Sequence, residues 1–74
     1  MNVYVIKRLT GDVLAVNRTT LGVSMELYGL DVEMLGDQPC DADAVETAMS
    51  KTPSIRVTTT TGEILEVERH YLGN

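Results

Sequence analysis

Few side chains in this sequence could act as nucleophiles or as general acids and bases. Cys40 is the single cysteine and His70 the single histidine. With one histidine, a histidine-based catalytic triad or a histidine pair on a metal ion is hard to build. No pattern brings Cys40 and His70 together, and a lone cysteine more often packs as a small apolar side chain than reacts. We therefore expect no catalytic residues and no enzyme activity.

Acidic residues gather in one short stretch, which contains Asp37, Asp41, Asp43 and Glu46. A calcium loop needs oxygen ligands at alternate positions and a glycine for its sharp turn, and Pro39 and Cys40 interrupt that spacing here. Acidic side chains are favourable in the first turn of a helix, which accounts for the cluster. The sequence also lacks a glycine-rich phosphate loop and a nucleotide-binding fingerprint. We expect neither a metal ion nor a cofactor.

The charges are unevenly placed along the chain, whose net charge is -5. Residues 23–52 hold seven of the eleven acidic residues and one basic residue, whereas residues 1–22 hold three basic residues and one acidic residue. An acidic middle opposes approach to a phosphate backbone, so direct contact with nucleic acid is not expected. It suits attraction to a basic protein surface, and the alternative is that it serves solubility alone.

Two stretches of the chain resemble each other. Thr10–Gly22 reads TGDVLAVNRTTLG and Thr61–Gly73 reads TGEILEVERHYLG, with seven of 13 aligned positions identical. Each stretch follows a β-rich run, so each pair of runs is typical of a β-hairpin. We predict a three-residue turn with glycine in the left-handed conformation in both hairpins, at residues 9–11 and 60–62.

These turns fix the register of both hairpins, because the apolar side chains must share one face. The predicted pairs of the second hairpin are Val57 with Leu65, Ile55 with Val67 and Arg56 with Glu66. Those of the first hairpin are Arg8 with Asp12, Ile6 with Leu14 and Tyr4 with Val16. Four equivalent positions are therefore expected in the core, namely Leu14, Val16, Leu65 and Val67.

The other face of the first hairpin is also largely apolar, unlike the polar outer face of the second. Its expected positions are Val3, Val5, Lys7, Val13, Ala15 and Asn17. A strand that is apolar on both sides is typically buried on both sides, so either a helix of this chain or a partner must cover this face. Exposed apolar patches rimmed by polar groups mark interaction sites. The predicted partner-binding residues are Val3, Val5, Lys7, Arg8, Val13 and Arg18.

The middle of the chain is expected to be rich in helix. Asp41–Lys51 begins with a suitable N-cap and is followed by Pro53, and its apolar stripe consists of Val45, Ala48 and Met49. Ser24–Gly36 is ambiguous between helix and strand. There, Ser24 could cap a helix and Gly36 could end it, with an apolar face made of Met25, Tyr28, Val32 and Leu35. Its methionine, glutamate and leucine content favours one or two helical turns.

The order of these elements predicts a small α+β fold. Two β-hairpins would form an antiparallel sheet of about four strands, with the helical middle segment packed against it, in a single domain spanning residues 1–74. No apolar run is long enough to cross a bilayer, and the N-terminus lacks a signal-peptide pattern. The single cysteine favours a reducing compartment. We expect a cytoplasmic protein that begins naturally at Met1.

Arg18–Val23, which reads RTTLGV and follows a strand, resembles the stretch after the first strands of swapped-hairpin DNA-binding regulators of the AbrB type. Those proteins carry a proline in the preceding strand and basic loops, whereas this chain has Asn17 and an acidic middle. Their function is therefore not carried over.

Together these features favour a non-catalytic protein-binding regulator or inhibitor of a larger cytoplasmic partner. The largest basic protein surfaces in a cell belong to nucleic-acid machinery, so RNA polymerase or a nuclease is the first target to consider, with the chain acting as a phage-type effector. The alternative is a dimeric nucleic-acid-binding module of a transcription regulator. Salt-sensitive binding to bare DNA would favour that module, and retention of one protein from a cell extract would favour the regulator.

Overall fold

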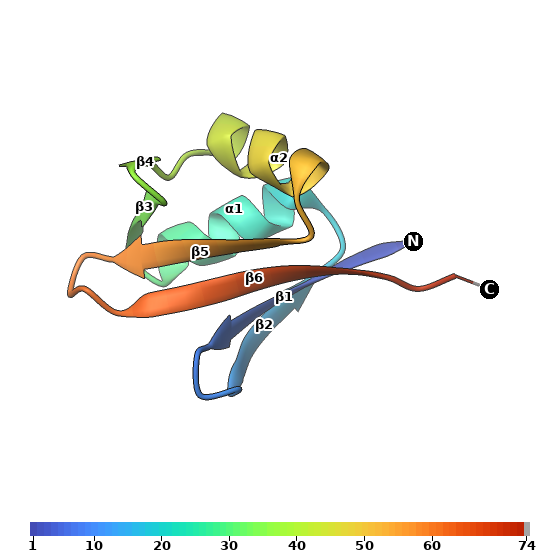
Figure 1. Cartoon of the computed structure of the whole chain (residues 1–74), viewed down its shortest axis with the longest axis horizontal. Helices are drawn as coiled ribbons and strands as arrows, with labels where there is room; N and C mark the ends of the chain where they lie inside the picture. The colour runs from blue at the N-terminus through green and yellow to red at the C-terminus, as the bar shows by residue number, and fades with distance from the viewer. Residues whose placement is uncertain (74) are drawn as a thin grey trace.

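Within residues 1–73, which the computed structural model describes, six antiparallel strands form one sheet and two helices lie on one of its faces (Figure 1). The strands are β1 (Asn2–Arg8), β2 (Val13–Asn17), β3 (Val32–Leu35), β4 (Gln38–Pro39), β5 (Ser54–Thr59) and β6 (Ile64–Tyr71), and the helices are α1 (Thr20–Gly29) and α2 (Ala42–Lys51). Their order across the sheet is β2-β1-β6-β5-β3-β4. The predicted α+β class is confirmed, and two short strands that the sequence did not reveal extend the sheet.

The core lies between the two helices and the inner face of the sheet. Its fully buried side chains are Ile6, Val23, Leu27, Val45, Met49, Val57, Leu65 and Val67. They come from β1, β5 and β6, the centre of the sheet, and from one side of each helix. Neither helix of the described residues has the length and apolar character required to span a membrane.

Both hairpin turns have the predicted three-residue form. The amide groups of Gly11 and Gly62 donate to the carbonyl oxygens of Arg8 and Thr59 at 2.9 Å, which closes a type I turn in each hairpin. Both glycines then adopt positive φ, 103° for Gly11 and 89° for Gly62. The second hairpin also has the predicted register, with Val57 opposite Leu65, Ile55 opposite Val67 and Arg56 opposite Glu66.

Replacing Gly62 by valine is expected to lower the free energy of unfolding by about 1 kcal/mol or more, because a β-branched residue is strained at positive φ. An added Cβ would meet no atom within 4 Å, so the cost arises from the backbone and not from a clash. Gly62→Asn is the control, since asparagine tolerates this conformation and should retain most of the stability. Urea denaturation followed by circular dichroism measures both, and equal losses would contradict the turn assignment.

The first hairpin departs from the predicted register at a β-bulge. Lys7 pairs with Val13, but the next paired residues are Ile6 and Ala15, which leaves Leu14 as an extra residue in β2. One extra residue moves every following side chain to the opposite face. Val16 therefore points outward and is 58% exposed, so its predicted burial is wrong. Leu14 is half-buried against the core, whereas Leu65 and Val67 are buried as predicted.

The bulge also changes the predicted outer face of this hairpin. Ala15 and Asn17 were expected to point outward, but they pair with the inward-facing Ile6 and Tyr4 and so lie on the core side. Val16, which pairs with Val5, takes their place on the outer face. Bulges are common in edge strands such as β2, where they add twist and hinder pairing with other chains.

α2 forms as predicted. Asp41 is the N-cap, and its Oδ1 accepts a hydrogen bond from the Ala44 amide at 2.9 Å. Val45 and Met49 are buried, and the helix ends at Lys51 before the extended residue Thr52. Local signals alone therefore defined both ends of this helix.

The ambiguous segment is part helix and part strand, so its predicted boundaries are wrong. α1 begins at Thr20, and its N-cap is Thr19, whose hydroxyl accepts from the Gly22 amide at 3.0 Å. The helix ends at Gly29, and Asp31 at a φ of 57° redirects the chain. Val32 and the residues up to Leu35 then form β3, because their backbone pairs with β5.

Candidate functional site

The two residues with potential for nucleophilic chemistry lie apart. Cys40 is half-buried on the helical side of the sheet, and its amide donates to the carbonyl of Glu33 at 2.8 Å. Burial, and then the neighbouring Asp41 carboxylate, raise the pKa of the Cys40 thiol, which favours the less nucleophilic protonated form. His70 lies near the end of β6, with Nε2 3.2 Å from Oε1 of Glu68 on the outer face. The structure does not bring Cys40 and His70 together.

The acidic cluster serves mainly as the start of α2. Asp41 is the N-cap and Asp43 lies in the first turn, where their negative charge interacts favourably with the helix dipole. Within residues 1–73, no three His, Cys, Asp or Glu side chains are placed to hold a metal ion together.

Four of the six predicted partner-binding residues share the outer face of the sheet, namely Val3, Val5, Lys7 and Val13. Val16 joins them because of the bulge. Val13 and Val16 are each 58% exposed, and Val3 and Val5 are half-buried. We call the apolar part of this surface, made of Val3, Val5, Val13 and Val16, the hairpin face.

The basic residues predicted to flank this surface have different surroundings. Nζ of Lys7 lies 3.0 Å from Oε2 of Glu68 across the β1–β6 pair, and Nε of Arg8 lies 2.9 Å from Oε2 of Glu63. The hydrogen bond from Lys7, followed by that from His70, holds the pKa of the Glu68 carboxyl below its usual value. Two of the three predicted cations therefore form ion pairs within the chain, whereas Arg18 is exposed in the connection between β2 and α1.

Neither helix covers the hairpin face. Both lie against the opposite, inner face, where Tyr4 and Ile6 of β1 are buried (Figure 1). The alternative that a helix of this chain covers the outer face is therefore wrong. β2 is also the edge strand next to this face, so its outer backbone groups have no neighbouring strand within residues 1–73.

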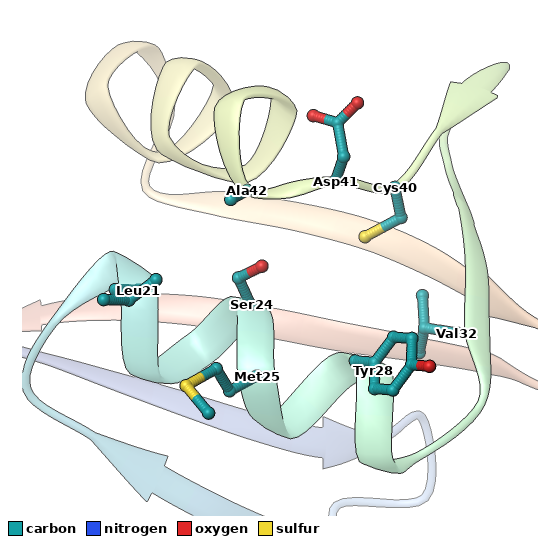
Figure 2. A pocket seen from close by; sticks show the side chains of 8 residues that line it. All are labelled: Leu21, Ser24, Met25, Tyr28, Val32, Cys40, Asp41 and Ala42. Atoms are coloured by element: carbon teal, nitrogen blue, oxygen red, sulfur yellow. The ribbon is translucent and has the colours of Figure 1, made fainter.

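A second apolar surface, missed by the sequence analysis, lies on the helical side. It is a groove between α1 and the segment that leads into α2, with a volume of about 540 Å³. We call it the α1 groove, and its lining residues are Leu21, Ser24, Met25, Tyr28, Val32, Cys40, Asp41 and Ala42. Figure 2 shows the thiol of Cys40 pointing toward α1, while the Asp41 carboxylate points away from the groove.

α1 is apolar on two sides. Val23 and Leu27 face the core and are 0% and 1% exposed, whereas Leu21, Met25 and Tyr28 on the far side are 63%, 69% and 85% exposed. A helix that is apolar all round is normally buried all round. α1 instead leaves three large apolar side chains in solvent, which is typical of an interaction surface.

The α1 groove is lined by residues from a strongly acidic segment of the chain. Every lining residue falls within residues 19–50, which contain seven acidic residues and no lysine, arginine or histidine. The ion pairs found within residues 1–73 join side chains outside this segment. The seven carboxylates therefore have no cationic partner in the described part of the chain, and their combined field is negative.

One sequence signal could have revealed this groove. Leu21, Met25 and Tyr28 have i, i+4, i+7 spacing, which places them on one side of a helix. The spacing becomes informative once Thr19 is identified as the N-cap, because Val23 and Leu27 then form a separate apolar side. A helix assumed to begin at Ser24 excludes Leu21 and hides the stripe.

Comparison with known proteins found no matching family model, no significantly similar curated protein and no significantly similar solved structure.

Proposed function

We propose that this chain is a non-catalytic regulator or inhibitor that binds a larger cytoplasmic protein through the hairpin face. The observation that supports this function best is the uncovered outer surface of the first hairpin. Val13 and Val16 are each 58% exposed there, beside the half-buried Val3 and Val5. Four valines on one sheet face form an apolar patch that a partner can desolvate.

The free edge of β2 adds to this surface. A partner strand placed alongside β2 could accept and donate backbone hydrogen bonds while its side chains cover Val13 and Val16. Complete burial of a valine contributes on the order of 1.5 kcal/mol relative to exposure, so the patch and the strand edge together give a basis for specific association.

The target that fits best is a protein with a basic surface. The net charge of -5 attracts such a surface and repels the phosphate backbone of nucleic acid. Extensive basic protein surfaces belong to nucleic-acid machinery, so we propose RNA polymerase or another such enzyme as the target of a phage-type effector.

Val13→Asp tests this function. Val13 is preferred to Val5, because Val5 lies opposite Glu68 and an aspartate there would place two carboxylates face to face. We expect the tagged wild-type chain to retain one larger protein from a cell extract, and Val13→Asp to reduce that retention at least about tenfold because a charge must be desolvated. Quantitative mass spectrometry measures the retained protein.

Thr47→Asp is the matched control, since it adds the same charge at an exposed position of α2 on the other side of the sheet. It should leave retention unchanged, and thermal melts should show that both variants are folded. A folded Val13→Asp chain that still retains the protein would contradict the hairpin face as the binding surface. Tight, salt-dependent binding of the wild type to bare DNA would instead support a dimeric nucleic-acid-binding module.

A further inference from the structure

We infer that the α1 groove is a binding site for a basic amphipathic helix of another protein. This site lies on the helical side of the sheet, opposite the hairpin face. It goes beyond the function proposed above and does not depend on it, because different residues form the two surfaces.

The shape of the exposed stripe suits a helix. Leu21, Met25 and Tyr28 span two turns of α1, a length of about 10 Å at 1.5 Å per residue. Cys40 and Ala42 form the facing wall (Figure 2). A helix lying along this groove would bring its own apolar residues at i, i+3 or i+4 and i+7 onto the stripe.

Two of the stripe residues have side chains suited to a binding site. Met25 has a flexible, polarisable side chain that adapts to the shape of a partner. Tyr28 is 85% exposed and offers a large, rigid ring, the kind of side chain that often anchors protein interfaces. Their exposure in the free chain means that a partner does not need to open the core to reach them.

The backbone around the groove favours a helix over an extended peptide. An extended peptide gains affinity by pairing with a free sheet edge. The edge strand beyond β3 is β4, which has only two residues. One of them is Pro39, which has no amide hydrogen to donate. The groove wall along α1 presents side chains, because the α1 backbone groups are bonded within the helix. A helical partner satisfies its own backbone and needs side-chain contacts only.

The negative charge of the segment that lines the groove indicates which polar residues the partner helix should carry beside its apolar stripe. Residues 19–50, which supply every residue that lines the groove, contain seven carboxylates and no basic group. Lysine and arginine beside the apolar stripe of the incoming helix would therefore be attracted during approach and at the rim of the complex. A second copy of this chain would bring a second acidic segment of the same kind, so self-association through this groove is disfavoured.

The experiment uses a fluorescein-labelled synthetic peptide of leucine and lysine, about 14 residues and four helical turns long, with all leucines on one side of the helix. A scrambled peptide of the same composition keeps the charge but lacks the apolar side. A leucine–glutamate peptide keeps the apolar side and reverses the charge. Fluorescence anisotropy at low and physiological salt should show that the whole chain binds the first peptide at least tenfold more tightly than either control.

Substitutions then locate the site. Met25→Lys places a charge in the groove at a position that is already 69% exposed, so the fold should persist while peptide affinity falls at least tenfold. Met25→Leu preserves the apolar surface and should bind as well as the wild type. Val13→Lys is the matched control, because it makes the same change of net charge on the hairpin face and should weaken binding far less.

Amide chemical shifts measured by NMR should move mainly in α1 and residues 40–42 when the first peptide is added. Equal binding of the scrambled peptide would overturn the inference, because charge alone would then explain the association. Equal weakening by Val13→Lys and Met25→Lys, or shifts confined to the sheet, would also overturn it. None of these outcomes affects the extract experiment with Val13→Asp, so failure of this site and failure of the proposed function can be told apart.

Discussion

Replacing Leu65 by alanine is expected to lower the free energy of unfolding by about 2–5 kcal/mol. Leu65 is 1% exposed and lies in β6 between β1 and β5, at the centre of the sheet and against the core. The substitution removes buried carbon atoms and leaves a cavity that the surrounding strands cannot fill. Total stabilities of small domains are about 5–15 kcal/mol, so this variant should lose a large share. Urea denaturation followed by circular dichroism measures the change.

Ile64→Ala is the matched control for this substitution. It removes the same number of carbon atoms from the adjacent residue, whose side chain points to the outer face and is 43% exposed. We expect a loss of less than about 1 kcal/mol, because much of the Ile64 side chain is already in water. Equal losses for the two variants would mean that the inner and outer faces of β6 are wrongly assigned.

The elements that could be predicted from the sequence are those that local rules define. Gly62 specifies the turn of the second hairpin through its positive φ, and the alternation of Leu65 and Val67 then fixes the register. Asp41 and Pro53 bracket α2 in the same local way. In each case the residues that determine the element lie within a few positions of it.

The elements that could not be predicted depend on contacts between distant segments. β3 exists because it pairs with β5, more than twenty positions later in the chain. The bulge at Leu14 follows from how the edge strand β2 fits against β1 and the core, which the hairpin turn alone does not determine. After Gly29, the pairing of β3 with β5 outweighs the local preference for helix, because helix propensities are weak.

Gly22 shows why the start of α1 was hidden. Glycine is a poor helix former, so the stretch TTLG does not resemble a helix start. In the structure a Cβ at Gly22 would lie 2.8 Å from Oδ1 of Asn17 and 3.1 Å from the Thr19 hydroxyl that caps the helix. The glycine therefore permits close packing of the helix start against the end of β2, at a cost in helix propensity.

The two candidate surfaces also differ in how far they could be predicted from the sequence. The hairpin face was predictable in part, because strand alternation places Val3, Val5 and Val13 on one side without any knowledge of the rest of the fold. The α1 groove requires three segments to meet, namely α1, Val32 of β3 and residues 40–42. Its stripe is visible in the sequence only when the helix phase is known, and the opposing wall is not visible in the sequence at all.

Replacing Arg69 by alanine is expected to lower the free energy of unfolding by about 1.5–3 kcal/mol, the range for a hydrogen bond to a charged group. Its Nη1 donates to the carbonyl oxygen of Met49 in the last turn of α2. A cation near a helix C-terminus is favourable, and this contact ties α2 to β6. Without the guanidinium, that carbonyl group must find water or stay unsatisfied. Chemical denaturation measures the loss, and an unchanged midpoint would show that the contact is not needed.

Arg18→Ala supplies a control from the chain's own repeat. Arg18 occupies the position equivalent to Arg69 in the first copy, but it is exposed and makes no side-chain hydrogen bond or ion pair within residues 1–73. Its removal should change the stability by less than about 0.5 kcal/mol, as for ordinary surface positions. If the stability loss is much larger for Arg69→Ala than for Arg18→Ala, the two arginines have different structural roles despite their matching positions. The repeat would then preserve the hairpin turn, while the role of each arginine depends on the element that packs beside it. Arg69 meets the end of α2, whereas Arg18 precedes the start of α1 and is exposed.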